Sequence, residues 1–518
     1  MLVRDSRSTT KDRLARFAPL ATIVLLSAAV FIVILLNRID WPIIDDFSLI
    51  IWHKGYAEGN TTLLNMLKFT NGSHPLGLLA IISAISFELF GISITPLILM
   101  SVVCIVVSAS LLWFAFGIQR DDGLSPIFIA AAFVPILFHP TQIKHLMWGF
   151  ELSWFMILLA LAACVFLVER GGRWVALSPL IAAAACLSSA HGIVVLPCLA
   201  LHLWLKRDAP YRWPLIAVCA LASGVAAVSL ARLSEQSAAR APDLITLLSV
   251  YAGVVGGAFG FKGHGLSISL GVLLLACCLF IGIHVVRSLR TLTPVDRVAT
   301  VLIAGSLMMV AAFTAGRSAY GLVWALGTFH AAPMMAPMLL AIFVWFLIVG
   351  CARRPALSIA AVVFVLASTL TSLPYAVSEA RAMLARQQIA LLISCDRGQL
   401  AEFSSAVNFG TDAYAASMRR AMVPLHPLCG QPVPQQIQEM VRFPDLYRTM
   451  IAADPRAEMP LRSIWEFYIM SPDLQRMFGS SGEERAMRLL DWATTQAKVG
   501  HIFHLDYQKS GEEYFKSR

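Results

Sequence analysis

Residues 17–36, FAPLATIVLLSAAVFIVILL, form an apolar run of the length that crosses a bilayer, and this run decides the fold class. Five basic residues precede it: Arg4, Arg7, Lys11, Arg13 and Arg16. Because basic residues are retained on the cytoplasmic side, the sequence predicts a cytoplasmic N-terminus. The length of the run and the lack of a small-residue cleavage site predict an anchor rather than a removed signal peptide.

Similar apolar runs recur along most of the 518-residue chain. Hydrophobic residues make up 58% of the sequence and charged residues 14%, and the mean hydropathy is +0.73. This composition excludes an ordinary water-soluble enzyme, and the uninterrupted runs exclude a β-barrel. We expect an all-α polytopic membrane protein. Eleven crossings are predicted, near residues 17–36, 93–118, 124–138, 152–169, 174–190, 191–206, 213–233, 265–286, 298–316, 333–350 and 356–374.

The apolar stretch 75–90 is interpreted as a helix that lies in or dips into the outer interface. With this choice, sixteen of the Lys and Arg residues before position 375 fall in cytoplasmic segments and eight fall outside. The bias supports eleven crossings and an outer C-terminus, while ten or twelve crossings remain possible. The net charge of +9 is thus a feature of membrane topology, and no nucleic acid partner is expected.

Residues 375–518 differ in composition from the membrane domain, residues 1–374. They hold sixteen basic and sixteen acidic residues, carry spaced aromatics and contain no run that could span a bilayer. We expect a soluble, mainly helical domain on the outer side, large enough for its own core. An oxidising compartment would permit a Cys395–Cys429 disulfide, and two unpaired thiols are the alternative.

Few residues on the outer side can act as acids or bases. None of the outer acidic residues before position 375 lies in the middle of a predicted crossing, where an ionised group usually marks an ion path. This pattern weakens an ion-coupled transporter, whereas uniporters and flippases remain compatible with it. The outer acidic residues are Asp40, Asp45, Asp46, Glu58, Glu88, Glu151, Glu235 and Asp243.

The first outer loop, residues 37–92, carries the densest polar segment. Residues 39–76 read IDWPIIDDFSLIIWHKGYAEGNTTLLNMLKFTNGSHPL and contain the adjacent pair Asp45 and Asp46 between apolar neighbours. Apolar surroundings raise the proton affinity of a carboxylate, which makes either residue a candidate general base. A solvated turn or a helix N-cap is the structural alternative.

Four further candidates lie near the predicted outer ends of crossings. Trp148 and Glu151 are three residues apart and would share a helix face, where an aromatic ring beside a carboxylate can hold a sugar. An interfacial Trp is the simpler alternative. His74 and His330 could each hydrogen-bond a sugar hydroxyl or serve only to cap a helix.

The loops between the later crossings supply outward cations and a glycine-rich segment. Residues 253–263 contain five glycines, which predict a flexible loop before the crossing at 265–286. Among the cations Arg317 is preferred for holding a phosphate, because a guanidinium matches phosphate geometry, and anchoring at the headgroups is its alternative. The outward cations are Lys54, Lys144, Arg240, Lys262 and Arg317.

Several short motifs carry a resemblance. Asn71-Gly72-Ser73-His74 ends the first loop, Trp148-Gly149-Phe150-Glu151 opens a later crossing after His139-Pro140-Thr141-Gln142, and Gly316-Arg317 and Thr328-Phe329-His330 follow. With the loop acids, this layout of residues 15–374 resembles the GT-C superfamily of integral membrane glycosyltransferases. A bacterial subgroup has Asn-Glu-His-Arg, Trp-Gly-Phe-Gln, Gly-Arg and Ser-Arg-Tyr at these places. This chain lacks the Glu and Arg beside the loop His and the Arg near Phe329, which removes groups that could hold substrate phosphates.

The resemblance implies an inverting transferase that moves a sugar from a polyprenyl-phosphate donor to an envelope glycan, lipid or protein. It implies a multi-pass protein of the bacterial inner membrane with its site on the periplasmic face, where membrane lipid gives the donor lateral access. No cofactor and no metal-ligand set is predicted, although a divalent metal remains possible. A lipid or polysaccharide transporter or flippase, and an inactive scaffold, are the alternatives. The expected site residues are Asp45 and Asp46 for catalysis and His74, Trp148, Glu151, Arg317, His330 and Lys262 for substrate binding.

Overall fold

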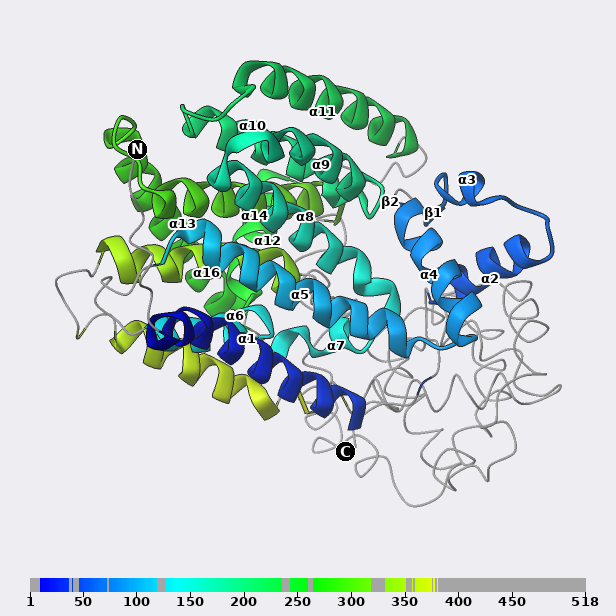
Figure 1. The fold of residues 1–518 in the computed structure, drawn as a ribbon, viewed down its shortest axis with the longest axis horizontal. Coiled ribbons are helices and arrows are strands. Elements are labelled where there is room, and N and C mark those ends of the chain that lie inside the picture. Colours follow the sequence, from blue (N-terminus) through cyan, green and yellow to red (C-terminus); the bar gives the residue numbers. More distant parts are fainter. Residues whose placement is uncertain are drawn as a thin grey trace.

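The computed structural model describes most of the chain up to residue 380 (Figure 1). The predicted domain at 375–518, with Cys395 and Cys429, lies almost entirely outside the described residues. The described residues are 10–36, 40, 46–71, 74–118, 126–234, 243–259, 264–317, 331–350, 356, 359–374, 376–377 and 380.

The described chain is helical apart from one short β-hairpin. From the start of α1 to the end of the first loop the elements are α1 (Thr10–Leu36), α2 (Asp46–Ala57), α3 (Leu63–Met66), β1 (Thr70–Asn71), β2 (His74–Pro75) and α4 (Gly77–Phe90). Then follow α5 (Thr95–Phe116), α6 (Pro126–Leu137), η1 (Pro140–Gln142), α7 (Ile143–Leu146), η2 (Gly149–Glu151), α8 (Leu152–Arg170), η3 (Gly172–Leu177), α9 (Ser178–Cys186), η4 (Ala190–Val194) and α10 (Val195–Leu205). The remaining elements are α11 (Arg212–Ser234), α12 (Leu244–Gly257), α13 (His264–Arg287), α14 (Pro294–Arg317), α16 (Ala331–Trp345) and the π-helical turn η6 (Phe346–Gly350).

Seven helices within the described residues are long and apolar enough to cross a membrane. Each coincides with a predicted crossing, which confirms a multi-pass, helical membrane protein. The other four predicted crossings, 124–138, 174–190, 191–206 and 356–374, contain shorter apolar helices. The seven candidate spans are Ala18–Leu36, Thr95–Phe116, Gly149–Arg170, Arg212–Ser229, Gly265–Arg287, Pro294–Gly316 and Ala332–Val349.

The first loop folds into a small unit beside the long helices, at the right of Figure 1. Helix α2 packs on α4, and the strands β1 and β2 pair antiparallel with Asn71 opposite His74. Helix α4 has 14 residues and is about 21 Å long, which is shorter than the ~30 Å of a hydrocarbon core. Helices of 12 and 9 residues lie in the predicted crossings 124–138 and 174–190, so length does not separate α4 from these segments.

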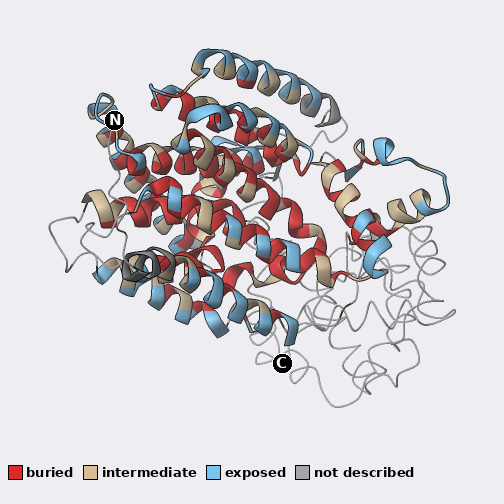
Figure 2. Ribbon diagram, in the orientation of Figure 1, coloured by how far each residue is buried: buried red, intermediate tan, exposed pale blue. Residues whose placement is uncertain are grey.

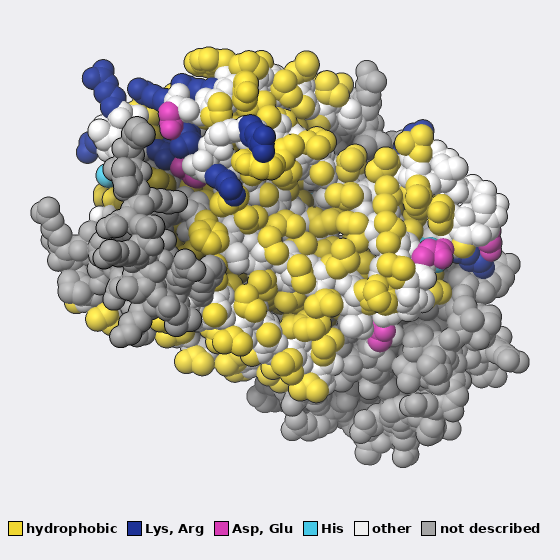
Figure 3. Space-filling view, viewed as in Figure 1, with side chains coloured by type: hydrophobic (Ala, Val, Ile, Leu, Met, Phe, Trp, Pro, Cys, Tyr) yellow, Lys and Arg dark blue, Asp and Glu magenta, His cyan; other side chains and the backbone are white. Residues whose placement is uncertain are grey.

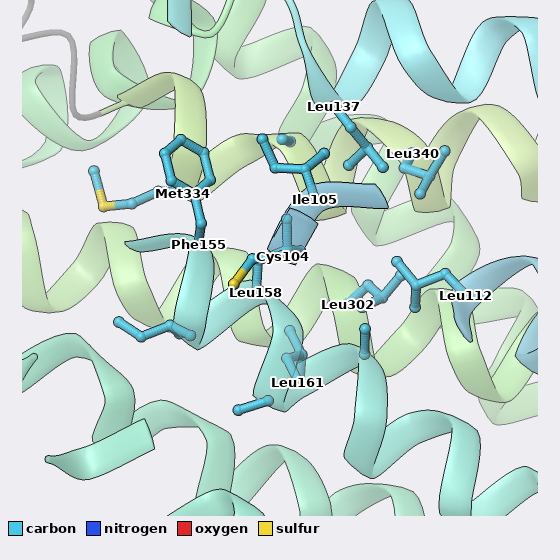
Figure 4. Close-up of a cluster of buried hydrophobic side chains, with 14 of the residues drawn as sticks. Cys104, Ile105, Leu112, Leu137, Phe155, Leu158, Leu161, Leu302, Met334 and Leu340 are labelled. Carbon is cyan, nitrogen blue, oxygen red and sulfur yellow. The ribbon is translucent and has the colours of Figure 1, made fainter. Parts of the chain in front are cut away.

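Apolar side chains fill the centre of the helix bundle (Figure 4). They come from α5, α6, α8, α14 and α16, and include Ile105, Leu137, Phe155, Leu302 and Leu340, all buried. The outer faces of α1 and α11 instead expose apolar residues (Figure 2). Figure 3 shows hydrophobic side chains over most of the visible face. Apolar residues both inside and outside are what a bundle surrounded by lipid requires.

Helices α12 and α13 pack with their backbones in direct contact. A Cβ atom added to Gly256 would lie 1.8 Å from the carbonyl oxygen of Ser267, and one added to Gly271 would lie 1.8 Å from that of Ala252. Small residues allow such close approach of two helices where the hydrophobic effect adds little to their association.

The helical structure of α12 contradicts part of the prediction that residues 253–263 form a flexible loop. Gly253, Gly256 and Gly257 belong to helix α12, while Gly260 and Gly263 lie outside the described residues. The prediction was wrong for the first three, which are helical, and at Gly256 the small side chain permits helix contact, a role that sequence alone does not distinguish from chain flexibility.

A buried ion network joins the helices at one end of the bundle. We call this the basic end; there α8, α10 and α13 finish and α11 and α14 begin. Glu169 accepts two hydrogen bonds of 2.7 Å from the Nε and Nη2 atoms of Arg297. Its Oε1 atom lies 2.8 Å from Nε2 of His202, and its Oε2 atom lies 3.7 Å from Nζ of Lys206. One carboxylate thus ties α8 to α10 and α14.

A second carboxylate extends the contacts at the basic end. Trp345 Nε1 donates a 2.9 Å hydrogen bond to Asp296 Oδ1, and His284 Nε2 lies 3.4 Å from the same oxygen. The backbone N–H and the hydroxyl of Thr293 donate to the other oxygen of Asp296. The start of α14 is therefore capped and joined to the ends of α13 and α16.

We expect Gly256→Ala to destabilise the protein by about 1–3 kcal/mol, because its methyl group would force α12 and α13 apart. The thermal unfolding midpoint of purified protein in detergent measures the effect. Gly282→Ala is the matched control, since a Cβ atom there meets nothing within 4 Å. Equal midpoints for the two variants would contradict the close packing.

Glu169→Gln should destabilise the protein by about 3 kcal/mol, because it leaves the Arg297 side chain, 13% exposed, without a compensating charge. Asp208→Asn is the control, since the Asp208 side chain is 80% exposed and its pairing with Lys206 contributes little. The two variants are compared by thermal unfolding. A Glu169→Gln protein as stable as the control would show that the network does not hold the helices together.

Candidate functional site

Asp40 attaches the start of the first loop to helix α5. Its Oδ1 atom accepts hydrogen bonds from the backbone N–H groups of Ile94, at 2.9 Å, and Thr95, at 3.0 Å. Its Oδ2 atom accepts a 2.6 Å hydrogen bond from the hydroxyl of Ser93. These N–H groups lie at the helix start, where they have no partner within the helix. The Asp40 carboxylate therefore acts as the N-cap of α5 from a distant part of the chain.

Asp46 makes the corresponding contact with the Trp148–Glu151 motif. It is the first residue of α2 and is fully buried, and its Oδ1 atom accepts a 2.7 Å hydrogen bond from the backbone N–H of Phe150. A Cβ atom on Gly149 would lie 3.2 Å from that oxygen and 2.6 Å from a methyl of Ile94, so glycine permits the approach. Two motifs that were identified separately in the sequence thus meet at the start of α8.

A buried acid–imidazole pair lies beside this contact. Glu151 ends η2 and is 3% exposed, and its Oε2 atom lies 3.0 Å from Nδ1 of the fully buried His145 in α7. The ring of Trp148 stacks on that of Phe150, with 6.0 Å between centroids, and is nearly buried. Trp148 and Glu151 are therefore neighbours, but their side chains contact Phe150 and His145 respectively rather than forming one open platform.

His74 belongs to an aromatic cluster built from three parts of the chain. Its ring stacks on His191 of η4 at 5.6 Å between centroids, and His191 also contacts the ring of Trp154 in α8 at 4.6 Å. Trp154 is three residues after Glu151, so both clusters involve the first turn of α8. Sequence analysis did not include Trp154, and the only signal for His191 was its place between two apolar segments.

Some predicted site residues cannot be compared with these contacts. Asp45, Lys262 and His330 lie outside the described residues, and Arg317 is the last residue of α14, with its side chain also outside them. Of the other outward cations, Lys54 pairs with Glu58 at 3.7 Å and Lys144 lies in α7 next to His145. Within the described part of the chain, no group of three or more His, Cys, Asp or Glu side chains could hold a metal ion.

A hollow of about 900 Å³ opens on the first-loop unit. Tyr56, Thr61, Thr62 and Glu88 supply its polar edges, and Leu63 and Leu64 its apolar part. His53 lies next to it, 3.9 Å from Glu88, and burial lowers the pKa of His53 although Glu88 opposes the shift. The hollow lies on α2, α3 and α4, separate from the contacts at the start of α8.

His139 lies buried where α6 ends. Its Nδ1 atom lies 2.9 Å from the hydroxyl of Thr141, and its Nε2 atom lies 3.2 Å from the hydroxyl of Ser368. Burial lowers the pKa of His139 to about 4. The hydroxyl of Thr141 lies 3.3 Å from the carbonyl oxygen of Ala258, so this neutral ring joins three segments at the end of the bundle that carries the first loop.

Comparison with known proteins identifies no relative of this chain. It matches no protein-family model, no curated protein and no solved structure. The chemistry of the site must therefore be argued from its own residues.

We expect the protein to lose stability in acid because His139 is buried in its neutral form. Because the pKa in the folded protein lies below that of a free imidazole, the unfolded chain takes up the proton first as the pH falls from 6.5 to 4. The free energy of unfolding should fall by up to about 3 kcal/mol over this range through His139 alone. Unfolding midpoints measured across this range should fall less steeply for His139→Gln. Parallel profiles for the two proteins would contradict the prediction.

Proposed function

We propose that the protein is an inverting glycosyltransferase that uses a polyprenyl-phosphate sugar as donor. One observation carries the proposal: buried Asp46 bonds to the backbone of Phe150, which joins the start of α2 in the first loop to the segment that holds Glu151 and His145. Acid, imidazole and aromatic groups from separate parts of the chain thus meet at one end of the bundle. Such a convergence is typical of a site that binds a polar substrate.

The two adjacent acids take different roles in this proposal. Asp46 is fully buried and one of its oxygens is used by a backbone N–H, so we assign it to positioning. Asp45 is the general base that removes the proton of the acceptor hydroxyl. The acceptor oxygen forms a bond to the anomeric carbon, the bond from that carbon to the phosphate oxygen breaks, and the lipid phosphate leaves. Attack opposite the leaving group inverts the anomeric centre.

The remaining residues are assigned by their neighbours. His74, with His191 and Trp154, would contact sugar hydroxyls and ring faces, and the Glu151–His145 pair would fix the segment at the start of α8. Arg317, Lys262 and His330 are proposed for the donor phosphate, because a cation there offsets the charge of the leaving group. The acceptor is an envelope glycan, lipid or protein, and a divalent metal could assist.

The proposal includes a membrane topology. The seven long helices and the four shorter segments would make eleven crossings in the inner membrane of a bacterium, with the N-terminus in the cytoplasm. The basic end would then face the cytoplasm, as basic residues favour. The first loop and the domain formed by residues 375–518 would lie in the periplasm, where the donor lipid reaches the site sideways from the bilayer.

The packing argues against the transporter alternative. Apolar side chains fill the space between α5, α6, α8, α14 and α16, and the Glu169 network joins three helices at the basic end. A substrate path through this bundle would have to open the core and separate buried charges, which is costly. A transferase that works on one face needs neither change.

We expect Asp45→Asn to reduce sugar transfer by about 10²–10⁴-fold, because the acceptor loses its base. Asp46→Asn should retain more activity, since an amide oxygen still accepts the hydrogen bond from Phe150. Reconstituted protein is incubated with a panel of polyprenyl-phosphate sugars, and release of the lipid phosphate is measured.

Asp40→Asn is the matched control for this experiment. It removes an acid from the same loop, yet an amide oxygen can still cap α5, so activity should be unchanged. A greater loss of activity with Asp46→Asn than with Asp45→Asn would mean that Asp46 is the base and Asp45 the positioning residue. Wild-type protein that transports the lipid but turns over no donor would favour the flippase, and protein that neither transports nor transfers would favour the scaffold.

A further inference from the structure

The basic end carries two sets of cations that differ in their surroundings. Arg297 and Lys206 lie inside and contact Glu169. Arg170, Arg173 and Arg207 are exposed and Arg212 is half-buried, and among the described residues none of these four pairs with a carboxylate. Figure 3 shows Lys and Arg side chains gathered at this end, at the upper left. Within the described residues, the charge of this outer set is therefore not balanced by a carboxylate.

Two of the unpaired arginines lie over exposed tryptophans. The guanidinium of Arg173 is 5.1 Å from the ring centroid of Trp174 in η3, and that of Arg212 is 4.7 Å from that of Trp213 in α11. The exposed fractions of these rings are 44% and 64%. Tryptophans so exposed at the ends of membrane helices are typical of the lipid headgroup level.

The two Arg–Trp pairs belong to neighbouring elements. Element η3 leads into α9, and α9 contacts both α10 and α11. Arg212 also donates from Nη2 to the carbonyl oxygen of Trp204, an exposed residue near the end of α10, at 2.8 Å. Its Nε atom is buried and has no hydrogen-bond acceptor among the described atoms. The guanidinium is thus held in place with a donor left over.

We propose that η3 and the turn between α10 and α11 form a binding site for an anionic phospholipid. The planar guanidinium of arginine matches the geometry of a phosphate group, and each cation near an anionic membrane surface adds to the attraction. A lipid fits better than free phosphate because Leu177 and Leu180, 45% and 71% exposed, offer apolar contact to acyl chains beside Arg173. This site is independent of the proposed transferase chemistry.

The test measures stabilisation of the full chain in detergent by added lipid. Phosphatidylglycerol should raise the unfolding midpoint, whereas phosphatidylcholine and inorganic phosphate should not. The double variant Arg173→Gln/Arg212→Gln should bind phosphatidylglycerol about tenfold or more weakly. Arg287→Gln/Arg290→Gln is the control, because it removes two exposed cations from the same end that, unlike Arg173 and Arg212, do not lie over a described tryptophan ring.

A second measurement covers the case in which the double variant fails to fold. Brominated phosphatidylglycerol should quench the tryptophan fluorescence of the wild-type protein more than brominated phosphatidylcholine at equal mole fraction. This additional quenching by brominated phosphatidylglycerol should vanish in the double variant Trp174→Phe/Trp213→Phe. Three results would each overturn the proposal. They are an equal loss of binding in the two arginine double variants, equal stabilisation by inorganic phosphate and by phosphatidylglycerol, and equal quenching by the two brominated lipids.

Discussion

The backbone N–H groups at the starts of α5 and η2 need acceptors near a membrane surface, and two carboxylates of the first loop supply them. Asp40 bonds to Ile94 and Thr95, and Asp46 bonds to Phe150. Helix starts without partners are costly where water is scarce. The same hydrogen bonds that complete these helices also fix the loop against the bundle, so stability of the membrane domain and geometry of the candidate site depend on the same contacts.

This arrangement separates structural from chemical roles among neighbouring acids. A carboxylate that is buried and bonded to a backbone N–H is well suited to hold the chain and poorly suited to exchange protons with a substrate. Asp46 meets the first description, which is why the proposal gives the base role to its neighbour. Asp46 therefore accepts a hydrogen bond at a helix start, as the N-cap alternative for the acidic pair supposed. The element that it caps lies more than 100 residues further along the chain.

Sequence could predict the parts that depend on local composition. Long apolar runs identified the seven candidate spans, and residues 77–90 do form a helix of their own, whereas its interpretation as a helix that does not cross stays a prediction. Contacts between distant segments could not be predicted: nothing local brings His74 to His191 or Asp46 to Phe150. Gly256 of α12 was misinterpreted for a related reason, since its role depends on Ser267 and Gly271 of another helix. Asp45, Asp46 and Arg317 were chosen by residue type, by their neighbours in the sequence and by resemblance, none of which gives their contacts.

The two ends of the bundle use charge differently, and this difference bears on function. At the basic end Glu169 and Asp296 are each surrounded by several partners that join helices, which favours one fixed arrangement. At the other end Glu151 pairs with His145, and both lie next to a loop attached by single carboxylates. A fixed basic end is compatible with the proposed transferase, whose substrate would enter and leave at the other surface only. Alternating access would instead require both ends to open, and the buried network at the basic end opposes that motion.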